Sequence, residues 1–199
     1  MSALFSDPSW RRGATLLSGE TIEVDANSNP IAGRDIVGQV KIFQDVNPST
    51  GAMNSNRLVY CVAARYTGSN GLTSADAGKV IVFSDSAPLT EFDDASMADA
   101  DNTNLTEGKA YGVLDEYIPE GVTVRTNDIV WVVAKGPCTV QKLTGAGNDI
   151  AAGAVVEISA TDGKVQDGAD VVGLVLGQCL ATAGTAATTA RINLHNAMI

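Results

Sequence analysis

The residues of this 199-residue chain that could carry out chemistry are few and scattered. His195 is the one histidine in the sequence, and it lies close to the C-terminus. A Ser/His/Asp or Cys/His catalytic arrangement needs a buried histidine that is oriented against a nucleophile. We expect His195 to be exposed instead. A single histidine also fails to supply the ligands of the usual zinc or non-haem iron site.

Two pairs of neighbouring acidic residues, Asp93-Asp94 and Asp115-Glu116, could supply the two carboxylates of glycoside hydrolysis. Sites that cleave sugars generally add aromatic platforms, whereas aromatic residues make up only 5% of this chain. Both pairs belong to a strongly acidic region, residues 85–120. We therefore interpret these carboxylates as a solvated acidic surface. A hydrolase that depends on Asp93 or Asp115 is the weaker alternative.

Neither of two loop motifs completes a ligand site. Residues 99–108, DADNTNLTEG, alternate acidic and hydroxyl residues as a calcium loop does, but Asn104 replaces the required glycine and Ala110 the bidentate glutamate. This excludes an EF-hand and leaves a looser calcium site open. Residues 143–149, LTGAGND, lack the Gly-Lys-Ser/Thr ending of a phosphate loop. We expect no catalytic set, no cofactor and no metal.

Charge and cysteine usage restrict the partners and the compartment. The formal net charge is −10, which opposes the direct binding of nucleic acid. The three cysteines, Cys61, Cys138 and Cys179, lie in apolar contexts without zinc-site spacing, so we expect them to be buried. The N-terminus lacks the pattern of a signal peptide, and no apolar segment approaches 18 residues. We expect synthesis in a reducing cytoplasm and no membrane segment.

The elements that must position these residues are short β-strands. Runs rich in valine and isoleucine alternate with Gly, Asn, Asp, Ser and Pro, which is typical of antiparallel strands joined by turns. Nine such runs occur, at residues 38–44, 57–66, 79–84, 122–126, 129–134, 138–143, 154–159, 171–181 and 189–194. Asp162-Gly163 marks the clearest hairpin. The sequence therefore predicts an all-β fold of one or two small barrel or sandwich units.

The organisation along the chain suggests three parts. Residues 1–33 have little periodicity and predict an extended N-terminal arm; residues 34–126 predict a β domain with an acidic loop, and residues 127–199 a C-terminal β-barrel domain. Residues 89–102 fit either a short helix or a solvated loop. The runs ADAGKVIVFSDSA and DIAAGAVVEISAT share a pattern, so the chain could contain two related β units, at about 58–126 and 129–194.

The C-terminal third carries a set of motifs that resembles a known family. These are a Gly-Pro-containing hairpin in DIVWVVAKGPCTVQKL, AAGAVVEIS followed by DGKV, the strand VGLVLGQCLATA with the turn GTAA, and the closing ARINL. Together they resemble the small β-barrel domain of capsid decoration, cement and capsid-fibre proteins of tailed bacteriophages. The resemblance implies a homotrimer that sits on the outside of the icosahedral shell and clamps neighbouring major capsid proteins.

We therefore predict a virion structural protein, a capsid cement or decoration protein without enzymatic activity. An exposed tryptophan beside arginines is typical of interface hot spots, so Trp10, Arg11 and Arg12 are the predicted contacts with the capsid, together with Arg34. The alternative is a receptor- or glycan-binding β module of a phage fibre or tail, in which Trp131 or Tyr111 would contact the sugar.

Overall fold

β-strands make up most of the regular structure in the computed structural model, which describes residues 37–47, 50–83, 90–101, 110–118, 120–168 and 175–195. The strands are β1 (Val40–Val46), β2 (Met53–Tyr66), β3 (Val80–Val82), β4 (Glu91–Phe92), β5 (Tyr111–Leu114), β6 (Ile129–Gln141), β7 (Val155–Ile158), β8 (Val165–Asp167), β9 (Val175–Cys179) and β10 (Thr189–Leu194). A 3₁₀ turn, η2 (Ser74–Asp76), and one short helix, α1 (Asp94–Ala98), complete them. The prediction of an all-β fold is confirmed.

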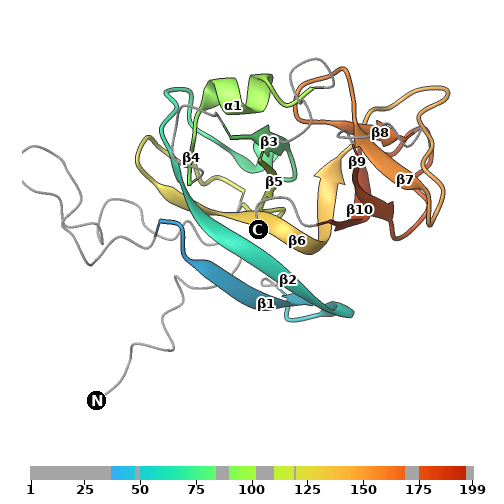
Figure 1. Ribbon diagram of the computed structural model, residues 1–199, viewed down its shortest axis with the longest axis horizontal. Coiled ribbons are helices and arrows are strands. Elements are labelled where there is room, and N and C mark those ends of the chain that lie inside the picture. The colour runs from blue at the N-terminus through green and yellow to red at the C-terminus, as the bar shows by residue number, and fades with distance from the viewer. Residues whose placement is uncertain are drawn as a thin grey trace, which may run out of the picture.

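All ten strands join one sheet (Figure 1). Its main path runs β1-β2-β6-β10-β9-β7-β8, while β5 pairs with β6 and β3 with β5 beside that path. Every pair is antiparallel except β2 with β4. The end strands β1 and β8 do not pair with each other in the described part of the chain, so this sheet is not closed into a barrel.

The strand β6 differs most from the sequence prediction. The Gly-Pro dipeptide at residues 136–137 predicted a hairpin, and this prediction is wrong: residues 129–141 form one continuous strand. Gly136 adopts a φ of 103°, so the strand bends there without reversing. Pro137 continues the ladder opposite Asn193. The first half of β6 pairs with β2 and the second half with β10, so each half has its own partner.

The same pattern of strand pairing occurs twice in the sheet. In the first unit the order is β2, the first half of β6, β5 and β3. In the second unit it is the second half of β6, then β10, β9 and β7. In chain order, β6 is the last strand of the first unit and the first strand of the second. Figure 1 shows β6 as a long strand crossing the molecule.

The registers of the two units also agree. Ile81 of β3 lies opposite Gly112, and Val156 of β7 lies opposite Gly177, so a glycine stands at the same place in both ladders. The same hydrogen bonds precede these pairs, from Gly78 N to the Leu114 carbonyl (3.1 Å) and from Gly153 N to the Cys179 carbonyl (2.8 Å). The two β units therefore share strand order and register. By register, YGVL (residues 111–114) corresponds to LGQC (residues 176–179). This segment begins four residues beyond the start of the sequence-based match at residues 172–176.

One hydrophobic cluster joins both units. It includes Val59 and Val113 from the first unit, Ile158 and Ile192 from the second, and Trp131 from the shared strand. A smaller cluster, around Tyr66, Phe83 and Phe92, lies within the first unit. The three cysteines are buried in the shared cluster, as predicted. The shared core contains residues from both sides of the predicted domain division at residues 126/127. That division stays a prediction.

Candidate docking surface

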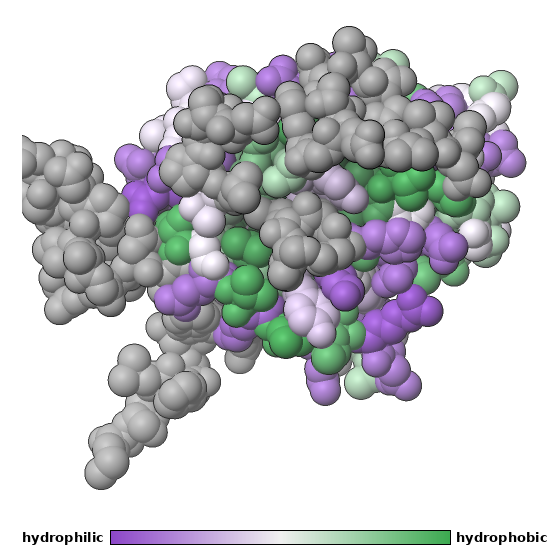
Figure 2. Space-filling view, in the orientation of Figure 1, coloured by the Kyte–Doolittle hydropathy of each residue, from purple (hydrophilic) through white to green (hydrophobic). Residues whose placement is uncertain are grey.

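The clearest surface feature of the described residues is the hairpin of β1 and β2. The exposed large hydrophobic residues of the described part all belong to it: Val40 is 50% exposed, Ile42 52%, Met53 59% and Leu58 49%. Single exposed apolar residues are ordinary, but apolar residues gathered on one element indicate a contact surface. Figure 2 shows hydrophobic side chains at the surface over this hairpin, with hydrophilic ones beside them.

Strand register places most of these side chains on one face. Ile42 lies opposite Tyr60, and Gln44 lies opposite Leu58. Directly opposite residues of an antiparallel pair share a face, so Val40, Ile42, Tyr60 and Leu58 form one apolar row. Met53 lies opposite Val46, beyond a bulge in the register. We call Val40, Ile42, Met53, Leu58 and Tyr60 the hairpin surface.

The exposed charged residues of β2 and β6 are basic. Arg57 and Lys135 are exposed, and the Lys135 Nζ lies 5.7 Å from the centre of the Tyr60 ring. Lys41, on the opposite face of β1, places its Nζ 5.2 Å from the centre of the Phe43 ring. The one carboxylate of β1, Asp45, is fully buried. On a chain of net charge −10, this region therefore favours a partner that is apolar and acidic.

A buried ion network fixes the hairpin to the second unit. The Arg191 guanidinium of β10 bonds both carboxylate oxygens of Glu116 at 2.8 Å and also bonds Asp45 of β1. The Glu116 carboxylate accepts the backbone N–H of Thr139, and the Thr139 hydroxyl lies 3.1 Å from Arg191. Four separate segments meet at these side chains. The network therefore holds β1 rigidly against the rest of the sheet.

Asp45 is the most buried member of this network. Burial alone would raise the pKa of its carboxyl, but hydrogen bonds from Arg191, Ser55 and Asn54 outweigh burial and hold the pKa below its usual range. The Ser55 hydroxyl donates to Asp45 at 2.6 Å. Burial disfavours the charged form of Arg191, and its hydrogen bonds to Asp45 and Glu116 outweigh that effect and raise its pKa. Asp45 and Arg191 are therefore both charged near neutral pH.

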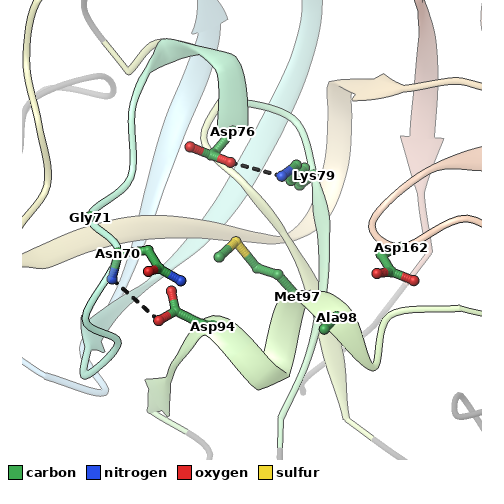
Figure 3. Close-up of a pocket in the computed structure, with 8 residues that line it drawn as sticks. All are labelled: Asn70, Gly71, Asp76, Lys79, Asp94, Met97, Ala98 and Asp162. Atoms are coloured by element: carbon green, nitrogen blue, oxygen red, sulfur yellow. Dashed lines mark hydrogen bonds and ion pairs between the residues drawn. The ribbon is translucent and has the colours of Figure 1, made fainter.

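A pocket of about 260 Å³ is the second candidate. Figure 3 shows its lining from η2, α1 and the adjoining loops. The lining residues are Asn70, Gly71, Asp76, Lys79, Asp94, Met97, Ala98 and Asp162. Three carboxylates and one ammonium group face this space. Such a composition could attract a cation, so the contacts of each carboxylate decide its role.

Two of these carboxylates hold the surrounding loops. Asp76 bonds Lys79 at 2.8 Å and the backbone N–H of Thr73 at 2.9 Å. Asp94 accepts the Tyr66 hydroxyl and the backbone N–H of Ser69. The bond from Tyr66 is the main cause that lowers the pKa of Asp94. Within the described ranges, no group of three His, Cys, Asp or Glu residues is placed to hold a metal ion. We interpret the pocket as a by-product of these loop contacts.

The other chemical candidates have structural contacts. Asp93 caps α1 by accepting the Ser96 N–H at 2.9 Å. Asp115 is buried and accepts the Tyr117 N–H at 3.3 Å, and Glu116 pairs with Arg191. His195 is exposed, as predicted. These geometries assign the acidic residues to loops, caps and the ion network.

The aromatic residues considered for sugar binding are not on the surface as platforms. Trp131 is 1% exposed and packs edge-on against Phe43, with ring centres 5.2 Å apart. Tyr111 is half-buried, and its hydroxyl bonds the Val175 carbonyl at 3.4 Å. Burial raises the pKa of Tyr111. Trp131 therefore offers no open face for a sugar, and Tyr111 packs against the main hydrophobic cluster.

The predicted capsid contacts, Trp10, Arg11, Arg12 and Arg34, lie outside the described residues, as does the arm at residues 1–33. The hairpin surface was not among the predicted sites. Its strands were predicted, but VKIFQDV is apolar on both faces and so gives no sign of which face is exposed. The described helices include none long and apolar enough to cross a membrane.

The sequence matches no protein-family model and no curated protein. The resemblance to phage capsid proteins therefore stays a prediction.

Proposed function

We propose that the protein is a structural protein that covers and joins protein surfaces, and that it serves as a capsid cement or decoration protein on the outer shell of a bacteriophage. The observation that carries the proposal is the hairpin surface, which gathers the exposed large hydrophobic residues of the described part on one rigidly held element. Its partner would be the major capsid protein, and its place the exterior of the virion.

The contacts of the acidic residues support this proposal. The carboxylates examined as acid–base candidates, Asp93, Asp94, Asp115 and Glu116, are engaged in caps, loop contacts and an ion pair. The hairpin surface and the exposed side chains of Arg57 and Lys135 can instead contact an acidic, apolar partner surface. A protein that withstands load on a shell also benefits from buried networks that lock its strands together.

The predicted anchors complete the proposal. Trp10, Arg11 and Arg12 would add an aromatic and bidentate hot spot to the apolar hairpin surface, and Arg34 would add charge close to β1. Docking by two separated surfaces raises avidity without requiring either contact to be strong. This arrangement suits a protein that bridges neighbouring capsid subunits.

Sedimentation of the protein with shells of the phage that encodes it tests this function. Leu58→Glu places a charge on the hairpin surface without changing β1, and we expect it to weaken shell binding by at least about tenfold. Ala186→Glu, at an exposed position of the second unit, is the matched control and should bind within about twofold of the unmodified protein. Unmodified protein that never sediments with shells, or equal binding by the two variants, would contradict the proposal.

A further inference from the structure

The outer edge of β1 has backbone groups that no other strand of the described part uses. The carbonyl of Gln39 accepts the Ala63 N–H at 3.0 Å, so the backbone of Gln39 points toward β2. Orientation alternates along a strand, so Lys41 and Phe43 also point toward β2, whereas Val40, Ile42 and Gln44 point away from it. Among the described residues β1 pairs with β2 alone. Three successive outward sites therefore bond to no other strand of the described part.

Between Val40 and Gln44 this edge has neither a proline nor a bulge, because the register shift of β1 lies beyond Gln44. Natural edge strands are often protected by proline, by bulges or by outward charges. The three outward residues of β1 are two aliphatic residues and one amide, and no proline occurs between Val40 and Val46. The same Val40 and Ile42 are half-exposed on the hairpin surface. The outward backbone groups and the exposed apolar side chains together favour pairing of β1 with a strand of another molecule.

The sequence of β1 is complementary to itself about Ile42. In an antiparallel pair with a second copy centred there, Ile42 meets Ile42 of the other copy, and Val40 meets Gln44. Lys41 then lies opposite Phe43 of the other copy, in a closely spaced pair. Within one copy, the Lys41 Nζ lies 5.2 Å from the centre of the Phe43 ring. The pairing would allow the same kind of contact between the two copies. No two like charges are opposed.

We propose that two copies of this chain associate through their β1 strands, in antiparallel register about Ile42, and so form one continuous sheet. A two-fold axis relates the copies, so this association gives a dimer and not the homotrimer that the family resemblance implies. The two hairpin surfaces then lie side by side on one face and make a single larger apolar surface. This inference rests on the proposed function, because it names a second copy of the chain as a partner of the same β1–β2 hairpin. A seven-residue strand buries less area than a stable dimer needs, so association is in the micromolar range.

The test is the mass of the full chain in solution by analytical ultracentrifugation, up to high micromolar concentration. The expected mass is that of a dimer. Ile42→Pro removes an N–H that points away from β2, so it blocks edge pairing but keeps the β1–β2 bonds; we expect association to weaken at least about 100-fold. Ile42→Thr keeps the N–H and should remain dimeric. A monomer or trimer for the unmodified chain, or a dimer with Ile42→Pro, would overturn the inference.

A cysteine crosslink decides the matter if Ile42→Pro fails to fold. Ile42→Cys places two thiols opposite each other across the proposed axis, at a separation that a disulfide can span. The native cysteines are buried, so they do not compete. We expect a disulfide-linked dimer with Ile42→Cys and none with Lys135→Cys, an exposed control on β6. Failure of Ile42→Cys to crosslink would refute the pairing. Shell binding is measured separately, so the two proposals can fail independently.

Discussion

Arg191 joins four segments of the described part through its contacts with Asp45, Glu116 and Thr139. Its guanidinium neutralises two carboxylates, Asp45 and Glu116, whose side chains are 0% and 5% exposed. We predict that Arg191→Met lowers the free energy of unfolding by about 3–5 kcal/mol, because both carboxylates would remain buried without a cation. Urea denaturation measures this loss. Arg125→Met, at an exposed position, should change the stability by less than about 0.5 kcal/mol. A similar small change in Arg191→Met would show that the network contributes little.

Asp45 makes the stability depend on acid pH. The native network holds the pKa of Asp45 below its ordinary value of 3.8, so the unfolded state binds the proton more readily. The contribution of Asp45 is therefore complete above its ordinary pKa and is lost as the pH falls through the lower native pKa. We predict that urea midpoints fall steeply below about pH 4 in the unmodified protein and less steeply in Asp45→Asn. Parallel slopes would contradict the assignment, because Asp76 and Asp94, whose pKa values are also lowered, are present in both proteins.

Among the elements, β6 determines how the two units are joined. At its bend, a Cβ on Gly136 would stand 2.3 Å from the Leu58 carbonyl oxygen, and the φ of 103° is unfavourable for other residues. We predict that Gly136→Ala destabilises the protein by at least about 2 kcal/mol, because backbone must shift in β2 or β6. Gly184→Ala, where nothing lies within 4 Å of the added carbon, is the control. Equal thermal stability of the two variants would show that the bend tolerates a side chain.

The sequence predicts most of the strands but not how they connect. The runs at 189–194 and 154–159 and the turn at Asp162-Gly163 correspond to β10, β7 and the β7–β8 hairpin. The run at 122–126 gives only a single bridge, at Val124. The break expected at Gly136-Pro137 is absent because each half of β6 has a partner strand, and tertiary pairing outweighs local turn preference. Pairing partners are set by contacts distant in sequence, which local patterns do not contain.

The candidate surface was harder to predict than the strands, for a physical reason. Alternation identifies a buried face only when the other face is polar, and β1 carries Val40 and Ile42 on one face and Phe43 on the other. Which of them is covered depends on Trp131, which packs on Phe43 from 88 positions further along the chain. The buried pairing of Asp45 with Arg191 is equally distant. Sequence alone offers no signal that would have joined these residues.

At the scale of the whole molecule, the shared core predicts cooperative unfolding. The main hydrophobic cluster contains residues of both units, and the Arg191 network adds charged contacts between them. We predict a single transition in calorimetry, with equal calorimetric and van't Hoff enthalpies for the described body. Two separate transitions would instead support independent domains on either side of residues 126/127.

We propose that this chain works by covering a shell. Cryo-electron microscopy of purified particles, with and without the protein, tests it most directly. We expect density for the β-sheet body on the outer capsid surface, with the β1–β2 hairpin at a contact, and shells that rupture more easily when the protein is missing. Particles that carry no such density while the protein remains free in the infected-cell lysate would contradict it.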